Sequence, residues 1–266
     1  MKRIATGLTF GIAWFLLLFF GPFPLFWAVL VLLSAAALHE YGRLLQRLAS
    51  NHYTIVSVLL GLLPPLAAYS GHPEPVTAGL IMALVLLFAL TLCRRGAMEN
   101  GFDFVARTTF GIVYAGLLPA YLILIMAKPH GAAWLVVLTA LIIASDTGAY
   151  YSGRLLGRHK LCPTISPNKT VEGFAGGLLS GVAAGTGLGL LLVPGSSSLR
   201  LALVALVVSC LGVMGDLLES VLKRSVAVKD SGTILPGHGG ILDRTDSLLV
   251  AAPVFYYLLA WGLLTG

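Results

Sequence analysis

The chain carries few charged residues for its length. Lys, Arg, Asp and Glu together make up 11% of its 266 residues, whereas 58% are hydrophobic, and the mean hydropathy is +0.92. Apolar runs of about 20 residues recur along the whole chain, and such a run is long enough to cross the ~30 Å hydrocarbon core of a bilayer. This composition excludes an ordinary soluble domain and predicts an integral membrane protein.

Other absences narrow the class further. The ~10-residue segments of alternating polarity that mark a transmembrane barrel are missing, so the spans are predicted to be helical. Cys93, Cys162 and Cys210 lie far apart and form no CxxC motif, which argues against a disulfide framework or a zinc site. The pattern GxxxxGK[ST] is absent, although residues 168–170 read NKT, and Walker-type ATP hydrolysis is therefore excluded.

The apolar runs predict an all-α polytopic membrane protein with about nine transmembrane helices. Short polar or Gly- and Pro-containing segments separate the runs. The predicted spans are 5–20, 24–38, 54–70, 76–93, 109–127, 132–150, 173–193, 199–218 and 247–265.

The basic residues are distributed unevenly between the two predicted sides of the membrane. Fifteen of the 17 Lys and Arg fall in the N-terminus and alternate connecting segments, and only Lys128 and Arg200 fall on the opposite side. Because basic residues accumulate on the cytoplasmic side, this bias predicts a cytoplasmic N-terminus in a bacterial-type inner membrane. It also explains the net charge of +6 without a nucleic-acid partner.

The whole chain, 1–266, is predicted to form one membrane domain. Its first part, 1–108, has the character of scaffold or lipid-facing helices. The second part, 109–266, contains two long polar segments, 151–172 and 219–246, which are predicted to lie on the cytoplasmic side and to form the active site.

Asp216 lies at the cytoplasmic end of the span 199–218. If the helix continues, Asp216, Glu219, Ser220 and Lys223 share one face. Carboxylates at membrane depth are costly and therefore indicate function. An acid and a base on one helix face also form ordinary ion pairs worth about 0.2–0.5 kcal/mol, so both interpretations stay open for this group.

Asp243 and Asp246 stand just before the last predicted span and point the same way at its start. Asp is a good helix N-cap and favours the positive end of the helix dipole. Converging carboxylates are also the hard oxygen ligands that Mg²⁺ prefers. The spacing alone does not decide between these two roles.

Bases and glycines lie between and beside these acids. Lys223, Arg224, Lys229 and Arg244 are accompanied by the run His238–Gly240, whose backbone N–H groups are suited to approach an anion. A basic cluster often binds anionic lipid, but the interleaved acids would weaken such a patch. The combination favours a site for a metal-bound polyphosphate. The segment that begins near Asp146 offers similar groups: Ser166, Lys169, Thr170 and Glu172.

The stretch SVLKRSVAVKDSGTILPGHGGILDRTDS, residues 220–247, resembles the signature of the phosphatidate cytidylyltransferases. That signature reads S-x-apolar-K-R-x4-K-D-x-small-x2-apolar-P-x-H-G-G-apolar-x-D-R-x-D. The chain meets every fixed position: Ser220, Lys223, Arg224, Lys229, Asp230, Gly232, Pro236, His238, Gly239, Gly240, Asp243, Arg244 and Asp246. Residues 145–173 are similar to that family's second characteristic segment.

The resemblance implies a Mg²⁺-dependent reaction of CTP with phosphatidic acid that yields CDP-diacylglycerol and pyrophosphate, with a second cation left open. It implies that Asp216, Asp243 and Asp246 hold the metal. The implied catalytic residues are Asp216, Lys223, Arg224, Lys229, Asp230, His238, Asp243, Arg244 and Asp246. The implied substrate-binding residues are Asp146, Ser166, Lys169, Thr170, Glu172, Ser220, Gly239 and Gly240.

The expected partners are CTP, phosphatidic acid and membrane lipids. A homodimer stays open, because the Gly-rich run 173–190 suits close helix packing within one chain or between two. A transporter for an anionic substrate is the main alternative, but such sites tend to lie at the bilayer midplane. A phosphotransferase acting on polyprenyl or CDP-alcohol substrates is another alternative. The CDP-alcohol transferase pattern DGxxAR…GxxxD…D is absent.

Overall fold

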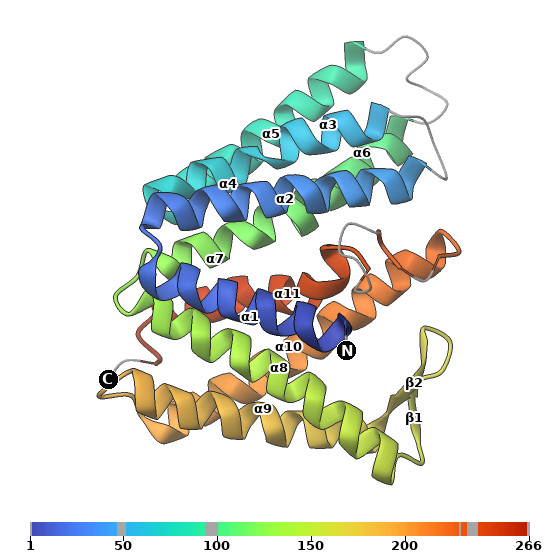
Figure 1. Ribbon diagram of the computed structural model, residues 1–266. Helices are drawn as coiled ribbons and strands as arrows, with labels where there is room; N and C mark the ends of the chain where they lie inside the picture. The colour runs from blue at the N-terminus through green and yellow to red at the C-terminus, as the bar shows by residue number, and fades with distance from the viewer. Residues whose placement is uncertain (1, 47–51, 94–100, 229, 233–238, 265–266) are drawn as a thin grey trace. The chain divides into compact units, whose positions relative to one another are not determined.

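The structure, a computed structural model, describes the chain except residues 1, 47–51, 94–100, 229, 233–238 and 265–266. The described chain is mostly helical, which confirms the predicted all-α class (Figure 1). The helices are α1 (Lys2–Phe20), α2 (Phe23–Gln46), α3 (His52–Gly61), α4 (Leu63–Ala67), α5 (Pro73–Cys93), α6 (Gly101–Gly111), α7 (Leu118–Met126), α8 (Gly131–Leu156), α9 (Val171–Leu192), α10 (Ser198–Ser225) and α11 (Leu242–Ala260).

Within the described residues, six helical stretches are long and apolar enough to cross a membrane. They are Phe23–Leu44, Pro73–Cys93, Gly101–Met126, Gly131–Leu156, Val171–Leu192 and Ser198–Ser225. Two more predicted spans correspond to the shorter apolar helices Gly11–Phe20 and Thr54–Ser70, and the last corresponds to α11. A polytopic membrane protein is thus confirmed, whereas the number nine and the orientation stay predictions.

The chain divides into two compact units. The first combines residues 1–127 with 226–244, and the second combines residues 128–225 with 245–266. In the first unit α2 packs against α3, and α6 continues through a π-helical turn, Ile112–Leu117, into α7. Tyr41 of α2 donates a hydrogen bond to the backbone oxygen of Arg107 on α6 at 2.7 Å, which ties these two helices together.

A stripe of glycines organises the second unit. Every fourth residue on one face of α9 is a buried glycine: Gly173, Gly177, Gly181, Gly185 and Gly189. A Cβ at Gly177 would lie 2.9 Å from the backbone oxygen of Ser145 on α8, and one at Gly185 would lie 3.0 Å from Ala205 on α10. The stripe therefore packs inside one chain, and it supplies no argument for a homodimer.

A short β-hairpin, which the sequence analysis did not predict, connects α8 to α9 (Figure 1). Its strands, β1 (Lys160–Cys162) and β2 (Ser166–Thr170), are antiparallel, with Lys160 opposite Thr170 and Cys162 opposite Ser166. Thr170 ends β2 and caps α9, because its Oγ1 accepts a hydrogen bond from the N–H of Gly173 at 3.1 Å. The predicted polar segment 151–172 is thus an ordered structure that leads directly into a helix.

Candidate active site

Four acids of the second unit gather near one another and form what we call the acidic cluster: Asp146 on α8, Asp216 and Glu219 on α10, and Asp246 on α11. Asp146 interacts electrostatically with Asp216. Asp246 interacts electrostatically with both of these aspartates and lies near Glu219. The predicted acids Asp146, Asp216 and Asp246, which are up to 100 positions apart in the sequence, therefore lie close enough to interact, and their role as one site stays a prediction.

Two members of the acidic cluster, Asp216 and Glu219, lie on one face of α10. This helix continues to Ser225, so the predicted shared face of its acids and bases is confirmed. Lys223 Nζ lies 2.7 Å from Glu219 Oε2, and the Glu219 side chain is only 2% exposed. Ser220 Oγ donates a long hydrogen bond, 3.5 Å, to Asp216 Oδ1. Helix pairing, one of the two interpretations left open, thus accounts for the contact between Lys223 and Glu219.

Lys169 connects the hairpin to α10. Its Nζ lies 2.7 Å from Asp216 Oδ2, and the two side chains are 23% and 38% exposed. Lys169 also interacts electrostatically with Asp146. A predicted substrate-binding lysine thus contacts a predicted catalytic aspartate. The β-hairpin places this lysine beside α10.

Gly215, next to Asp216, allows α11 to lie directly against α10. A Cβ at this position would lie 2.5 Å from the backbone oxygen of Asp246 and 2.9 Å from the Cα of Ser247. A side chain at position 215 would separate the two helix backbones. The glycine thus keeps Asp246 beside Asp216.

The chemistry of the acidic cluster fits a hard divalent cation. Asp146, Asp216 and Asp246 repel one another, and carboxylate oxygens are the ligands that Mg²⁺ takes, usually together with waters and substrate phosphates. Among the described residues, however, no three His, Cys, Asp or Glu side chains are close enough to hold an ion between them. The donor types fit the metal, but the protein alone does not form a complete cage.

Asp243 meets different partners in the first unit. Its Oδ2 accepts hydrogen bonds from the N–H of Ser231 at 2.9 Å, from the hydroxyl of Ser231 at 2.8 Å and from the N–H of Gly240 at 2.8 Å. This oxygen thus accepts three hydrogen bonds from the chain itself. Gly240, predicted to bind phosphate through its backbone, donates its N–H to this carboxylate, and its phosphate-binding role stays a prediction.

Gly239 has the left-handed backbone conformation that favours glycine, with φ +84°. A Cβ there would also lie 2.7 Å from Asp243 Oδ2. The double glycine that was predicted to admit an external anion thus lets the chain turn closely around Asp243.

Glu40 on α2 is a site residue that the sequence analysis missed. It is 2% exposed, and its Oε2 accepts hydrogen bonds from the N–H of Ile241 at 2.7 Å and of Leu242 at 3.1 Å. These N–H groups are at the start of α11. An acid near the end of an apolar span was the available signal, because such acids are rarely tolerated without a role.

Two predicted substrate-binding residues have local structural partners. Thr170 caps α9, as described above. Glu172 accepts hydrogen bonds from the N–H of Arg158 at 3.0 Å and from His159 Nδ1 at 2.6 Å, so it ties the end of α8 to the start of α9. Ser166 begins β2 opposite Cys162. No contact of these three residues argues for or against binding of CTP.

The other predicted residues lie at helix ends or beyond the described part. Arg224 is in the last turn of α10, Arg244 follows Asp243 on α11, and Asp230 is exposed. Lys229 and His238 lie outside the described residues. The catalytic roles of all five stay predictions.

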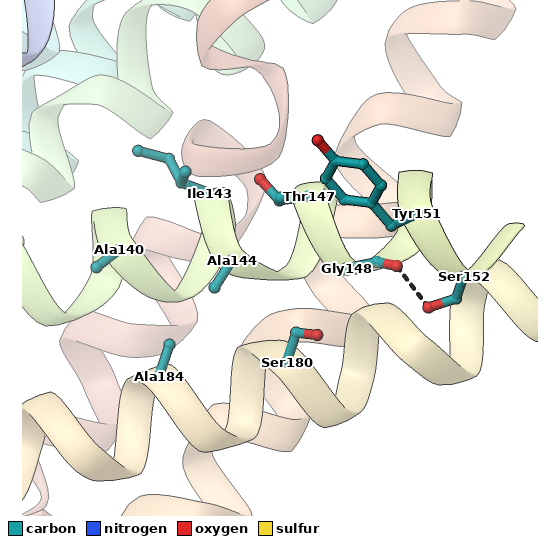
Figure 2. Close-up of a pocket in the computed structure, with 9 residues that line it drawn as sticks. All are labelled: Ala140, Ile143, Ala144, Thr147, Gly148, Tyr151, Ser152, Ser180 and Ala184. Carbon is teal, nitrogen blue, oxygen red and sulfur yellow. Dashed lines mark hydrogen bonds between the residues drawn. The ribbon is translucent and has the colours of Figure 1, made fainter. Parts of the chain in front are cut away.

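A groove lies between α8 and α9 and has a volume of about 760 Å³. Figure 2 shows Ala140, Ala144 and Thr147 of α8 on one side and Ser180 and Ala184 of α9 on the other. Alanines and Ile143 make much of its lining apolar, and the Ser152 hydroxyl donates to the backbone oxygen of Gly148 at 2.6 Å within α8. The groove is suited to an apolar chain.

Apolar helices that bring acids and lysines together in this way define a membrane protein with a polar, phosphate-compatible site. A sequence profile of the cytidylyltransferase family matches residues 1–261. The chain therefore belongs to the cytidylyltransferase family.

Bacterial relatives agree with this assignment. The chain is 37% identical over 264 residues to the phosphatidate cytidylyltransferase of Bacillus subtilis, covering 97% of each chain. It is 35% identical over 264 residues to the protein of that name from Helicobacter pylori, covering 98% of this chain and 93% of the relative. A Staphylococcus epidermidis protein of the same name is 38% identical over 181 residues, covering 67% of this chain and 69% of the relative.

The close approach at Gly215 gives a first test. We expect Gly215→Ala to lower the thermal unfolding temperature in detergent, because the added methyl group would force α10 and α11 apart. Overpacking of this kind costs about 1–3 kcal/mol. Thermal unfolding followed by intrinsic fluorescence measures the effect.

Gly187→Ala is the matched control, because a Cβ at Gly187 would meet no atom within 4 Å. Alanine favours a helix over glycine by up to about 1 kcal/mol, so this variant should be unchanged or slightly more stable. If both variants unfold at the same temperature, the α10–α11 contact at Gly215 is not as described.

Proposed function

We propose that the protein transfers the CMP group of CTP to phosphatidic acid, forming CDP-diacylglycerol and releasing pyrophosphate. The family assignment and the names of the bacterial relatives, phosphatidate cytidylyltransferases, support this activity. The structural observation that carries it is the contact of Lys169 with Asp216 beside Asp146 and Asp246, which supplies both charges a nucleotide-phosphate site needs.

In the proposed reaction a phosphate oxygen of phosphatidic acid forms a bond to the α-phosphorus of CTP. The bond from that phosphorus to the oxygen bridging to the β-phosphate breaks, and pyrophosphate leaves with the electron pair. The lipid phosphate is already ionised at neutral pH, so no general base is required. Positioning and charge neutralisation are then the main contributions of the protein.

The positive charges of the lysines would reduce the repulsion between the two anionic substrates. Lys169 is held at the acidic cluster by Asp216, and Lys223 is held one turn further along α10 by Glu219. Cations placed in advance where charge develops stabilise a transition state without reorganising. We propose that both lysines exchange part of their contact with these acids for phosphate oxygens when CTP binds.

We further propose that Asp216 and Asp246, with Asp146 nearby, would hold Mg²⁺; the metal role of Asp243 stays a prediction. When bound, the ion would neutralise phosphate charge and stabilise the leaving pyrophosphate. The donor chemistry supports this assignment, and the substrate phosphates would supply the ligands that the chain lacks. A second cation stays open.

The placement of the lipid follows from the apolar groove. We propose that an acyl chain of phosphatidic acid lies along it, between α8 and α9. The excess of basic residues in alternate segments supports an inner-membrane protein whose site faces the cytoplasm, where CTP is found.

A turnover assay tests the activity and the orientation together. Sealed inside-out vesicles containing the protein should convert labelled CTP into a lipid-extractable product only when phosphatidic acid and Mg²⁺ are present. Right-side-out vesicles should form this product only after permeabilisation, because CTP does not cross a bilayer. Absence of product from folded protein both in inside-out vesicles and in permeabilised right-side-out vesicles would refute the proposed function, and product in intact right-side-out vesicles would refute the orientation.

Asp246→Asn tests the acidic cluster. We expect kcat to fall on the order of 100-fold or more, because the substitution removes a charge from the group that would hold the cation. The unfolding temperature should change little, since asparagine keeps the shape of the side chain. Turnover with phosphatidic acid and CTP measures the first effect, and thermal unfolding measures the second.

Asp103→Asn is the matched control. Asp103 forms a half-exposed ion pair with Arg107 at 2.6 Å, and pairs of this kind contribute at most about 1 kcal/mol. We expect normal turnover from this variant. If the Asp246 and Asp103 variants are equally active, the role of Asp246 is to stabilise the start of α11 and not to take part in the reaction.

Ala144→Phe tests the groove. The larger side chain should fill part of it and raise the KM for long-chain phosphatidic acid, while the KM for CTP stays the same. Ala183→Phe is the control, because Ala183 is exposed on α9 and does not line the groove. If both variants keep the wild-type KM for the lipid, the acyl chain does not lie between α8 and α9.

A further inference from the structure

Glu40 makes the most unexpected polar contact in the first unit. It comes from α2, a helix in the part of the chain that the sequence marked as scaffold, and it contacts residues about 200 positions further on. Glu40 is buried, with 2% of the residue exposed. A buried carboxylate is tolerated only where hydrogen bonds compensate it, so its partners show what it does.

Those partners are the first backbone N–H groups of α11. Ile241 and Leu242 both donate to Oε2 of Glu40, at 2.7 and 3.1 Å. The first N–H groups of a helix have no partner within the helix and carry its positive potential. Asp243 satisfies the preceding N–H, that of Gly240, at 2.8 Å. Successive donors at the start of α11 are therefore divided between an acid of the helix itself and an acid of α2.

Two glycines beside this contact leave room for the Glu40 carboxylate. A Cβ at Gly232 would lie 2.5 Å from its Oε1, and one at Gly240 would lie 2.6 Å from its Oε2. Either methyl group would occupy the position of the carboxylate. Ser231, the residue before Gly232, donates its hydroxyl hydrogen bond to Asp243. The backbone on both sides of Glu40 thus approaches it as closely as only glycine allows.

Glu40 itself sits at a well-anchored point of α2. The next residue, Tyr41, is 1% exposed and donates to the backbone oxygen of Arg107. A Cβ at Gly42 would lie 2.6 Å from the Cα of Thr54 on α3. Neighbouring positions therefore tie α2 to α6 and to α3, so Glu40 presents its carboxylate from a rigid support.

We infer that Glu40 is a positioning residue, which holds the start of α11 in place and thereby Asp243 and Arg244 in its first turn. This inference rests on the proposed function for its catalytic consequence, because Asp243 and Arg244 are predicted catalytic residues. Glu40 touches no substrate in this proposal. It acts only through the backbone that it binds.

Two substitutions at position 40 separate hydrogen bonding from charge. Glu40→Gln retains one oxygen, and one oxygen accepts both N–H groups in the structure, so we expect it to behave nearly as the wild type. Glu40→Leu keeps the bulk and removes both acceptors. Glu74→Gln and Glu74→Leu are the matched controls, because Glu74 is exposed at the start of α5.

Hydrogen exchange measured by mass spectrometry reads the contact without any substrate. We expect a peptide containing Ile241 and Leu242 to lose protection in Glu40→Leu but to keep it in Glu40→Gln and in both Glu74 variants. If Glu40→Leu does not fold, Gly232→Ala replaces it, because the added methyl group displaces the carboxylate. Unchanged protection in the variant used would overturn the inference.

Kinetics then separate positioning from general stability. In Glu40→Leu we expect kcat to fall about 100-fold, as misplacement of a reacting group by about 1 Å does, with the KM for CTP little changed. Glu40→Gln should restore most of kcat. Glutamine as damaging as leucine would overturn the hydrogen-bonding role. Inactive wild-type protein would refute the proposed function, and hydrogen exchange alone would then decide whether Glu40 positions α11.

Discussion

Carboxylates in an apolar helical protein have to be compensated where they stand, since the surrounding side chains and lipid offer no water. An uncompensated buried charge costs several kcal/mol or more, so each acid must find donors or a cation. In the described part of this chain the compensation takes two forms. Glu40 and Asp243 use backbone N–H groups, and Asp216 and Glu219 use lysines. Within the first unit these contacts hold the start of α11 against α2, and within the second they hold the hairpin beside α10.

The two forms of compensation have different consequences. A carboxylate bound to backbone N–H groups is committed to structure, because a hydrogen bond that it lost would leave a buried donor without a partner. A carboxylate bound to a lysine belongs to a pair that can rearrange, since the ammonium sits on a flexible stem and accepts any anion nearby. Glu40 and Asp243 are thus suited to hold a loop, and Asp216 with Lys169 is suited to meet phosphate and cation.

Much of the fold was predictable because hydropathy and helix length are local properties. The predicted spans coincide with helices, and α10 extends past the predicted end at residue 218 to Ser225, which meets the condition for the shared face of Asp216 and Glu219. The hairpin was missed because its five-residue strand, SPNKT, contains a proline and no alternating apolar residues. It is ordered by its ends, where Thr170 caps α9 and Glu172 binds Arg158 and His159.

The site was predictable in its residue types but only partly in its contacts. The end of a predicted span located Asp216 and the signature located Asp243 and Asp246, yet spacing could not show that Asp243 Oδ2 binds Ser231 and Gly240. Glu40 lies far from the signature in sequence, so only the rule that acids are rare in apolar spans pointed to it.

The glycines of the signature connect these observations. An external phosphate and an internal carboxylate both need a backbone without side chains, so the pattern alone favours neither. The close approach of Gly232 and Gly240 to Glu40, and of Gly239 to Asp243, favours the internal anion. A stretch of sequence typical of substrate binding therefore also encodes its own support, and the residues that begin the next helix are bound by an acid in the first half of the chain.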